Sequence, residues 1–195
     1  MYKEKVSCCP YAKKVPTTPS PVPALPVPSI EKFGEKVELV VNQITIAPPN
    51  PPIFRIVDID KVVGITNFKL ASVNGPGVCH PWWTAKVIID GYVDKNILYK
   101  TITNFTEDAV SGPVHQYTTR VEFATFVEVR SMDPICLTDN VKICAAFVEG
   151  EIDELLDPND VAAGAPDFAI TYNSLLEKMI VKIVLKITKK ECCAR

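Results

Sequence analysis

Two pairs of adjacent cysteines lie near the ends of the chain and are its clearest candidates for covalent chemistry. Cys8 and Cys9 follow a short charged segment at the N-terminus, and Cys192 and Cys193 follow another near the C-terminus. Adjacent cysteines bond poorly to each other because disulfide geometry is demanding, and they lack the spacing of about two to four residues that zinc thiolates favour. We therefore predict that all four form disulfides with other copies of the chain. The alternative is that they are free, exposed thiols.

Three further cysteines bring the total to seven. An odd number indicates an intermolecular bond or a free thiol. Cys79 and Cys136 lie in turn-like segments and are candidates for an additional disulfide, whereas Cys144 lies in an apolar run over residues 141–147, where we expect a buried, unreactive thiol. Disulfides favour an oxidising destination, yet the N-terminus lacks the apolar stretch of a signal peptide. We expect synthesis in a cytosol and oxidation after release.

Other side chains offer little for catalysis or metal binding. His80 and His115 are the two histidines, and neither has the spacing of a zinc site. A catalytic pair of Cys79 and His115 would lack a third group to orient it. We expect no enzyme activity, no metal and no cofactor. A group of acidic residues could bind calcium but lacks the EF-hand pattern, so a solvated acidic loop is the favoured interpretation; its members are Glu149, Glu151, Asp153, Glu154, Asp157 and Asp160.

Trp82 and Trp83 follow Pro81 and could form a platform for a ligand. Indole rings suit a sugar or a partner surface, and they equally suit the plugging of a loop against the core. Carbohydrate binding or adhesion through these two residues is the alternative function that we consider.

Length, charge and hydrophobicity exclude several classes of protein. The 195 residues are enough for one large β domain with arms, and 47% of them are hydrophobic, which suffices for a core. The net charge is −2 with no dominant basic patch, so nucleic acid is a poor candidate partner. No stretch approaches the roughly 18 apolar residues of a membrane span.

Residues 10–28 form a region of distinct composition, because seven of these nineteen positions are proline. Such a segment favours extended polyproline II structure, which at about 3.1 Å per residue reaches roughly 60 Å. A compact domain of this size would be roughly 40 Å across, so the arm could place Cys8 and Cys9 on a neighbour. The alternative is a flexible linker. The expected organisation is an arm over 1–35, a domain over 36–188 and a tail over 189–195.

Alternating apolar and polar residues predict strands through most of the domain. The clearest cover 117–130 and 179–187, each with one apolar face. We expect a hairpin in which residues 84–92 pair with 96–102 through Asp94 and Lys95. Further strands and two short helical turns complete the prediction: strands over 36–46, 53–59, 61–70 and 141–149, and helical turns over 152–156 and 172–178. This pattern predicts an all-β, antiparallel β-sandwich, jelly-roll-like, with an extended N-terminal arm and a short cysteine-bearing tail.

Part of this strand pattern resembles a known family. Residues 87–93, Ile97-Leu98-Tyr99, Val114-His115, residues 121–129 and Val141-Lys142-Ile143 together resemble the SPOCS domain of clostridial spore-forming bacteria, over roughly residues 36–150. The resemblance implies a protein of the spore coat, cortex or exosporium, without catalytic residues. The chain departs from the family in having one such domain, no peptidoglycan-binding module and cysteine-bearing arms, which favours a building block.

The resulting hypothesis is a structural subunit that assembles head-to-tail with copies of itself. Disulfides would cross-link the product, which would be a spore-envelope layer or an appendage fibre. Other spore-envelope proteins are further candidate partners. The expected location is the spore surface, after synthesis in the mother-cell cytosol without a signal peptide.

Overall fold

The computed structural model describes residues 31–46, 48–77 and 81–190. The predicted contributions of Cys8, Cys9, Cys79, Cys192 and Cys193 therefore lie outside the described residues. The described part folds into eight strands: β1 (Glu31–Thr45), β2 (Arg55–Asn74), β3 (Trp83–Lys100), β4 (Asn104–Phe105), β5 (Val110–Ser111), β6 (Val114–Ser131), β7 (Asn140–Pro158) and β8 (Tyr172–Thr188). These described segments contain no helix that could cross a membrane.

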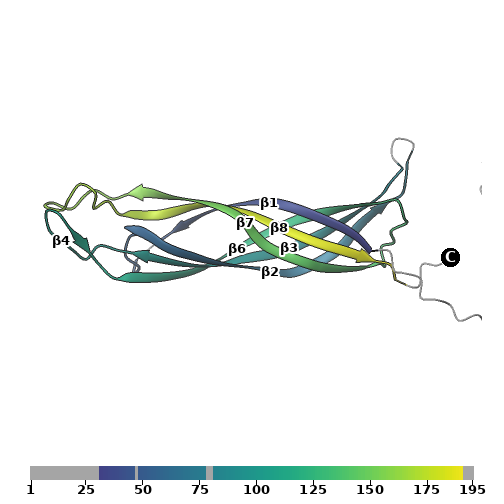
Figure 1. Ribbon diagram of the computed structural model, residues 1–195, viewed down its shortest axis with the longest axis horizontal. Coiled ribbons are helices and arrows are strands. Elements are labelled where there is room, and N and C mark those ends of the chain that lie inside the picture. The colour runs from purple at the N-terminus through teal and green to yellow at the C-terminus, as the bar shows by residue number, and fades with distance from the viewer. Residues whose placement is uncertain (1–30, 47, 78–80, 191–195) are drawn as a thin grey trace, which may run out of the picture.

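Two three-stranded antiparallel sheets form a sandwich. One sheet has the order β1-β8-β7 and the other the order β2-β3-β6. β1 faces β6 and β2 faces β7 across the interior. Figure 1 shows the two layers running along a long, narrow body, with the small β4–β5 ribbon at one end. The predicted all-β, antiparallel sandwich is confirmed.

The core comes from the alternation that the sequence displays. Every second residue of β8 points inward and is fully buried, while the intervening lysines lie on the outer side; the inward set is Met179, Val181, Ile183, Leu185 and Ile187. Val127 and Val129 of β6 are buried in the same cluster. A second, smaller cluster surrounds Ile53 and Tyr99 towards the β4–β5 end. Both predicted strand faces are thus confirmed.

The predicted hairpin at Asp94 and Lys95 is wrong, because β3 runs without a turn from Trp83 to Lys100. Val93, Lys95 and Ile97 keep the same alternation and are all fully buried. A lysine beside an aspartate is typical of an exposed turn, but this lysine is paired inside the sandwich. The strand therefore continues through the core.

The two predicted helical turns are also wrong, because residues 152–156 lie in β7 and residues 172–178 lie in β8. The predicted solvated acidic loop is wrong for Glu149 to Asp157, which belong to β7, whereas Asp160 follows the strand and is exposed. Asp153 is opposite Glu177 in the register, where both face the interior. Carboxylates at inward positions hide the apolar alternation by which a strand is recognised.

The body is longer than a compact domain of its size. β3 has 18 residues, which at about 3.3 Å per residue extend for about 60 Å. The expected compact diameter of roughly 40 Å is therefore wrong, because long strands spread the core along one axis. β1 begins at Glu31, within the range assigned to the arm.

Two β-bulges interrupt β7. Its register with β8 shifts between Ile143 and Ala145 and again between Val148 and Gly150. Cys144 is the extra residue of the first bulge and is exposed, so the prediction of a buried thiol is wrong. The second bulge resets the alternation, so Val148 and Glu151 both face the core.

Candidate functional site

The two tails leave the sandwich at the same end. Glu31, the first residue of β1, is opposite Thr188, the last residue of β8. The Lys186 ammonium lies 2.5 Å from the Glu31 carboxylate, and this contact raises the pKa of Lys186. The segment that carries Cys8 and Cys9 and the segment that carries Cys192 and Cys193 therefore join the body side by side.

The end of β2, the start of β3 and the β6–β7 connection also lie at this end of the body (Figure 1). Trp83 is opposite Ser131 and Asn74 is opposite Thr84, so the strand ends on either side of Cys79 lie where β6 leads into β7. That β6–β7 connection contains Cys136. We call this part of the molecule the cysteine-bearing end, defined by Glu31, Trp83, residues 131–140 and Thr188.

Polar contacts hold the β6–β7 connection against both tails. The Lys32 ammonium donates to the Pro134 carbonyl at 2.8 Å. The buried Asp139 carboxylate accepts from the Cys136 amide at 3.0 Å and from the Lys190 amide at 3.3 Å. Cys136 is therefore tied to the point at which the C-terminal tail begins. Its proximity to the tails was not visible in the sequence, because it depends on which strands pair.

The two tryptophans have different surroundings. Trp83 packs against the core and next to Gly75, whereas Trp82 is 41% exposed. These different surroundings do not indicate a flat platform formed by both rings. Carbohydrate binding stays a prediction.

His115 lies near the start of β6, at the other end of that strand from Ser131 and the cysteine-bearing end. It is opposite Tyr99 in the register and stacks on that ring, with the ring centroids 5.7 Å apart. β2 ends at Asn74, three residues before Gly77, and β3 begins at Trp83, two residues after Pro81. Both strand ends lie at the cysteine-bearing end. Cys79 itself lies outside the described residues, so the candidate Cys79–His115 pair stays a prediction.

The outer side of the β1-β8-β7 sheet carries exposed apolar side chains. Leu39 of β1 is opposite Ile180 of β8, and both are exposed. On the same side of the sheet, Lys182 of β8 lies between Val37 of β1 and Phe147 of β7. Lys178 of β8 likewise lies between Val41 of β1 and Ile152 of β7. We call this set the outer apolar face: Val37, Leu39, Val41, Phe147, Ile152 and Ile180. Contiguous exposed apolar residues typically mark an interaction surface.

Five charged side chains meet inside the sandwich, and we call them the core ion cluster: Lys61, Lys95, Glu151, Asp153 and Glu177. Lys95 of β3 donates to Glu177 of β8, and both side chains are fully buried. Lys95 Nζ also lies 3.8 Å from Glu151 Oε2 and 3.8 Å from Asp153 Oδ1.

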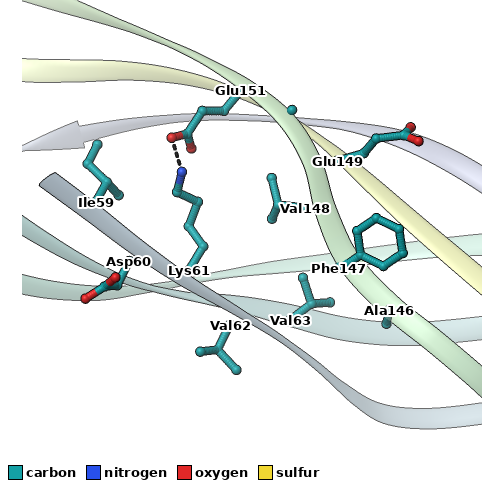
Figure 2. A pocket seen from close by; sticks show the side chains of 11 residues that line it. Ile59, Asp60, Lys61, Val62, Val63, Ala146, Phe147, Val148, Glu149 and Glu151 are labelled. Carbon is teal, nitrogen blue, oxygen red and sulfur yellow. Dashed lines mark hydrogen bonds and ion pairs between the residues drawn. The ribbon is translucent and has the colours of Figure 1, made fainter.

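The remaining lysine of the cluster lies beside a groove between the sheet edges. Figure 2 shows Lys61 of β2 and Glu151 of β7 pointing towards each other, where they form an ion pair. The groove has a volume of about 670 Å³ and is lined by residues 59–63 and 146–151. This pair is partly exposed, so water can reach it, in contrast to Lys95 and Glu177.

Burial dominates the electrostatics of the cluster. It raises the pKa of Glu177 despite the hydrogen bond from Lys95 and the charge of Lys95, which act in the opposite direction. Burial, followed by repulsion from Lys95, lowers the pKa of Lys61. Both shifts favour uncharged forms, because a charge in a dry interior is costly. The part of the chain that the structure describes contains no group of three or more acidic, histidine or cysteine side chains arranged to hold a metal ion.

Comparison with known proteins shows the family of the chain. A family model described as SipL, SPOCS domain, matches residues 52–153, which is more than half of the chain. The chain belongs to the SPOCS domain family. No curated protein and no solved structure matches the chain.

The SPOCS match confirms the resemblance seen in the strand pattern, and membership of the family points to a role in sporulation. The matched region begins before β2 and ends within β7, so β1 and β8 lie outside it. Glu177 also lies outside, whereas Lys61, Lys95, Glu151 and Asp153 lie within it. This SPOCS domain therefore completes its core ion cluster with a strand beyond the matched region.

Proposed function

We propose that this SPOCS protein is a structural subunit that assembles with copies of itself into a spore-envelope layer or appendage. Disulfides from the tail cysteines cross-link the assembly. The observation that carries the proposal is the cysteine-bearing end, where strands distant in sequence bring the cysteine-bearing segments to one part of the body.

With the cysteine-bearing segments of each subunit joined to one end of its body, one contact between two subunits would allow more than one cross-link. Several disulfides per contact would make release of a subunit slow, because each bond must open before the subunit can leave.

The sheets also offer surfaces for a neighbour. Within the described strands, β1 and β7 each have a partner on one side, as do β2 and β6. An unpaired strand edge can accept an added strand. The outer apolar face lies next to two of these edges, those of β1 and β7, and a second copy would cover it.

The arm has a suitable length for this geometry. Residues 10–30, extended as polyproline II, reach about 65 Å at about 3.1 Å per residue. That length is similar to the roughly 60 Å of β3. An arm that starts at the cysteine-bearing end could run along one neighbouring body and reach the cysteine-bearing end of that neighbour. Repetition of this contact builds an open, head-to-tail polymer.

Gel electrophoresis of four purified samples tests the proposal. The wild-type protein without reductant should run as a ladder, or fail to enter the gel, after boiling in detergent. Replacement of Cys8, Cys9, Cys192 and Cys193 by serine should abolish this ladder. Cys144→Ser, the matched control on a strand, should retain it, and reduced wild-type protein should run as a monomer. A single monomer band from oxidised wild-type protein would contradict the proposal.

A further inference from the structure

Lys95 and Glu177 form a fully buried ion pair that joins the two sheets of the sandwich. Lys95 belongs to the central strand of one sheet and Glu177 to the central strand of the other. Their side chains are 0% exposed and in direct contact. Val93 and Ile97 flank Lys95 on its strand, and Leu175 and Met179 flank Glu177, all of them fully buried. An amine and a carboxyl group therefore meet where apolar side chains exclude water.

The neighbouring carboxylates leave this contact electrically unbalanced. Glu151, Asp153 and Glu177 face two lysines, so the fully charged cluster would carry a net charge of −1. One oxygen of each carboxylate is buried without a hydrogen-bond partner: Glu151 Oε2, Asp153 Oδ1 and Glu177 Oε2. Groups in such surroundings tend to become neutral, because burying a charge without a partner is energetically unfavourable.

We propose that Lys95 and Glu177 condense to form an intramolecular amide bond between the two sheets. Lys95 first passes a proton to Glu177 along their hydrogen bond, which leaves a neutral amine and a neutral carboxylic acid. Nζ of Lys95 then attacks Cδ of Glu177. As the N–C bond forms, a C–O bond breaks and one water molecule leaves, so atoms balance and no other reactant is consumed.

Asp153 is positioned to move the remaining proton. Its Oδ1 lies 3.8 Å from Lys95 Nζ and has no hydrogen-bond partner. The carboxylate takes a proton from the attacking nitrogen and delivers it to the departing hydroxyl, and it ends in its original state. Asp153 and Glu151 are partly exposed, and Glu151 lines the groove, which gives the released water a way out.

The fold supplies the two conditions that this condensation needs. Fixed contact between the reacting groups replaces a bimolecular encounter, which is worth large factors in rate. Exclusion of water protects the product and removes the medium that would stabilise the separate charges. Lys61 and Glu151 form the corresponding pair beside the groove, where both are partly exposed, so that pair stays an ion pair.

The intact mass of the full, reduced and denatured protein tests the proposal. Wild-type protein should weigh one water less than its sequence. Lys95→Met and Glu177→Ala should each show the full mass of their sequences. The matched control Lys61→Met should still lack one water, because it leaves Lys95 and Glu177 in place. Wild-type protein at its full sequence mass would overturn the proposal, whether or not either core variant folds.

Peptide mapping then locates the bond. Trypsin should yield residues 87–100 joined to residues 143–178, uncleaved after Lys95, and fragmentation should place the bond at Glu177. A bond to Asp153 or from Lys61 would overturn the assignment. Asp153→Ala should lower the fraction of protein that carries the bond. Full reduction before each measurement separates the result from the disulfides of the proposed function.

Discussion

Two neighbouring isoleucines of β3 show how sharply the environment changes from one residue to the next. Ile89 is 0% exposed and Ile88 is 49% exposed. Ile89→Ala should lower the free energy of unfolding by about 2–5 kcal/mol, because it leaves a cavity. Ile88→Ala should change it by less than about 0.5 kcal/mol. Urea unfolding measures both, and equal losses would contradict the inward orientation of Ile89.

A surface ion pair on the other sheet gives a pH prediction. The Arg120 guanidinium contacts both oxygens of Asp94 at 2.6 and 2.8 Å and stacks on Tyr92. This contact holds the pKa of Asp94 below its usual value of 3.8. Ionised Asp94 therefore stabilises the fold above the unfolded-state pKa, and this contribution disappears as the pH falls through the folded-state pKa.

Arg120→Gln should raise the pKa of Asp94 towards 3.8. Carboxyl chemical shifts recorded by NMR across the acid range measure this midpoint. Arg130→Gln is the control, because Arg130 contacts Glu128 instead. An unchanged Asp94 midpoint in Arg120→Gln would mean that the contact is absent in solution.

The orientation of a side chain was predictable where apolar residues point inward and polar residues point outward. The inward faces of β6 and β8 were predicted because apolar residues alternate there with lysine, glutamate or threonine. Lys95 and Glu177 were not, since a charged residue at an inward position has the same sequence signature as an exposed one. Its partner lies 82 residues away, and sequence spacing does not reveal that contact.

At the scale of the strand, glycine positions depend on the strand opposite. A Cβ at Gly91 would come within 2.6 Å of Phe123 Cζ and 2.8 Å of the Gly64 carbonyl oxygen. Gly91 therefore leaves space for the Phe123 ring on β6. A Cβ at Gly150, in contrast, meets nothing within 4 Å.

Gly91→Ala should lower the free energy of unfolding by about 1–3 kcal/mol, because a packed ring must move. Gly150→Ala is the matched control and should be neutral or stabilising by up to about 1 kcal/mol, since it restricts the unfolded chain. Thermal unfolding of both variants beside the wild type gives the comparison. A loss in Gly150→Ala that equals the loss in Gly91→Ala would show that packing against Phe123 is not the cause.

Strand type was more predictable than strand length. β-branched residues and turn signals identified the β class, but the sequence suggested a break at Asp94 and Lys95 and helical turns in β7 and β8. In each case the charged residues of the core ion cluster, or residues next to them, interrupted the apolar pattern. The buried charges therefore account for most of the errors in strand assignment.

At the scale of the whole molecule, the N-terminal segment can be removed without loss of any described core residue. Deletion of residues 1–28 should leave a folded domain with the strand signature and melting temperature of the wild type, since β1 begins at Glu31. The truncated protein should no longer polymerise. Circular dichroism and electron microscopy measure the two properties, and an unchanged polymer would show that the arm is only a linker.

The position of the tails could not be predicted, because it depends on pairing between strands at opposite ends of the sequence. β1 and β8 are separated by more than a hundred residues, yet they are hydrogen-bonded along their full lengths. Alternation predicts each strand without indicating its neighbour. The cysteines were identified from the sequence, but their gathering at one end of the body required the sheet order.

The sheet order also constrains how the protein is made. β8 is the last described strand in the sequence, and it lies between β1 and β7 in its sheet. On the ribosome, β1 must therefore wait, without its partner, until β8 has emerged. The sheet β2-β3-β6 has no such delay, because all its strands are synthesised earlier. Contacts between residues distant in sequence form slowly. The β2-β3-β6 sheet is therefore expected to fold first, and β8 then docks onto it.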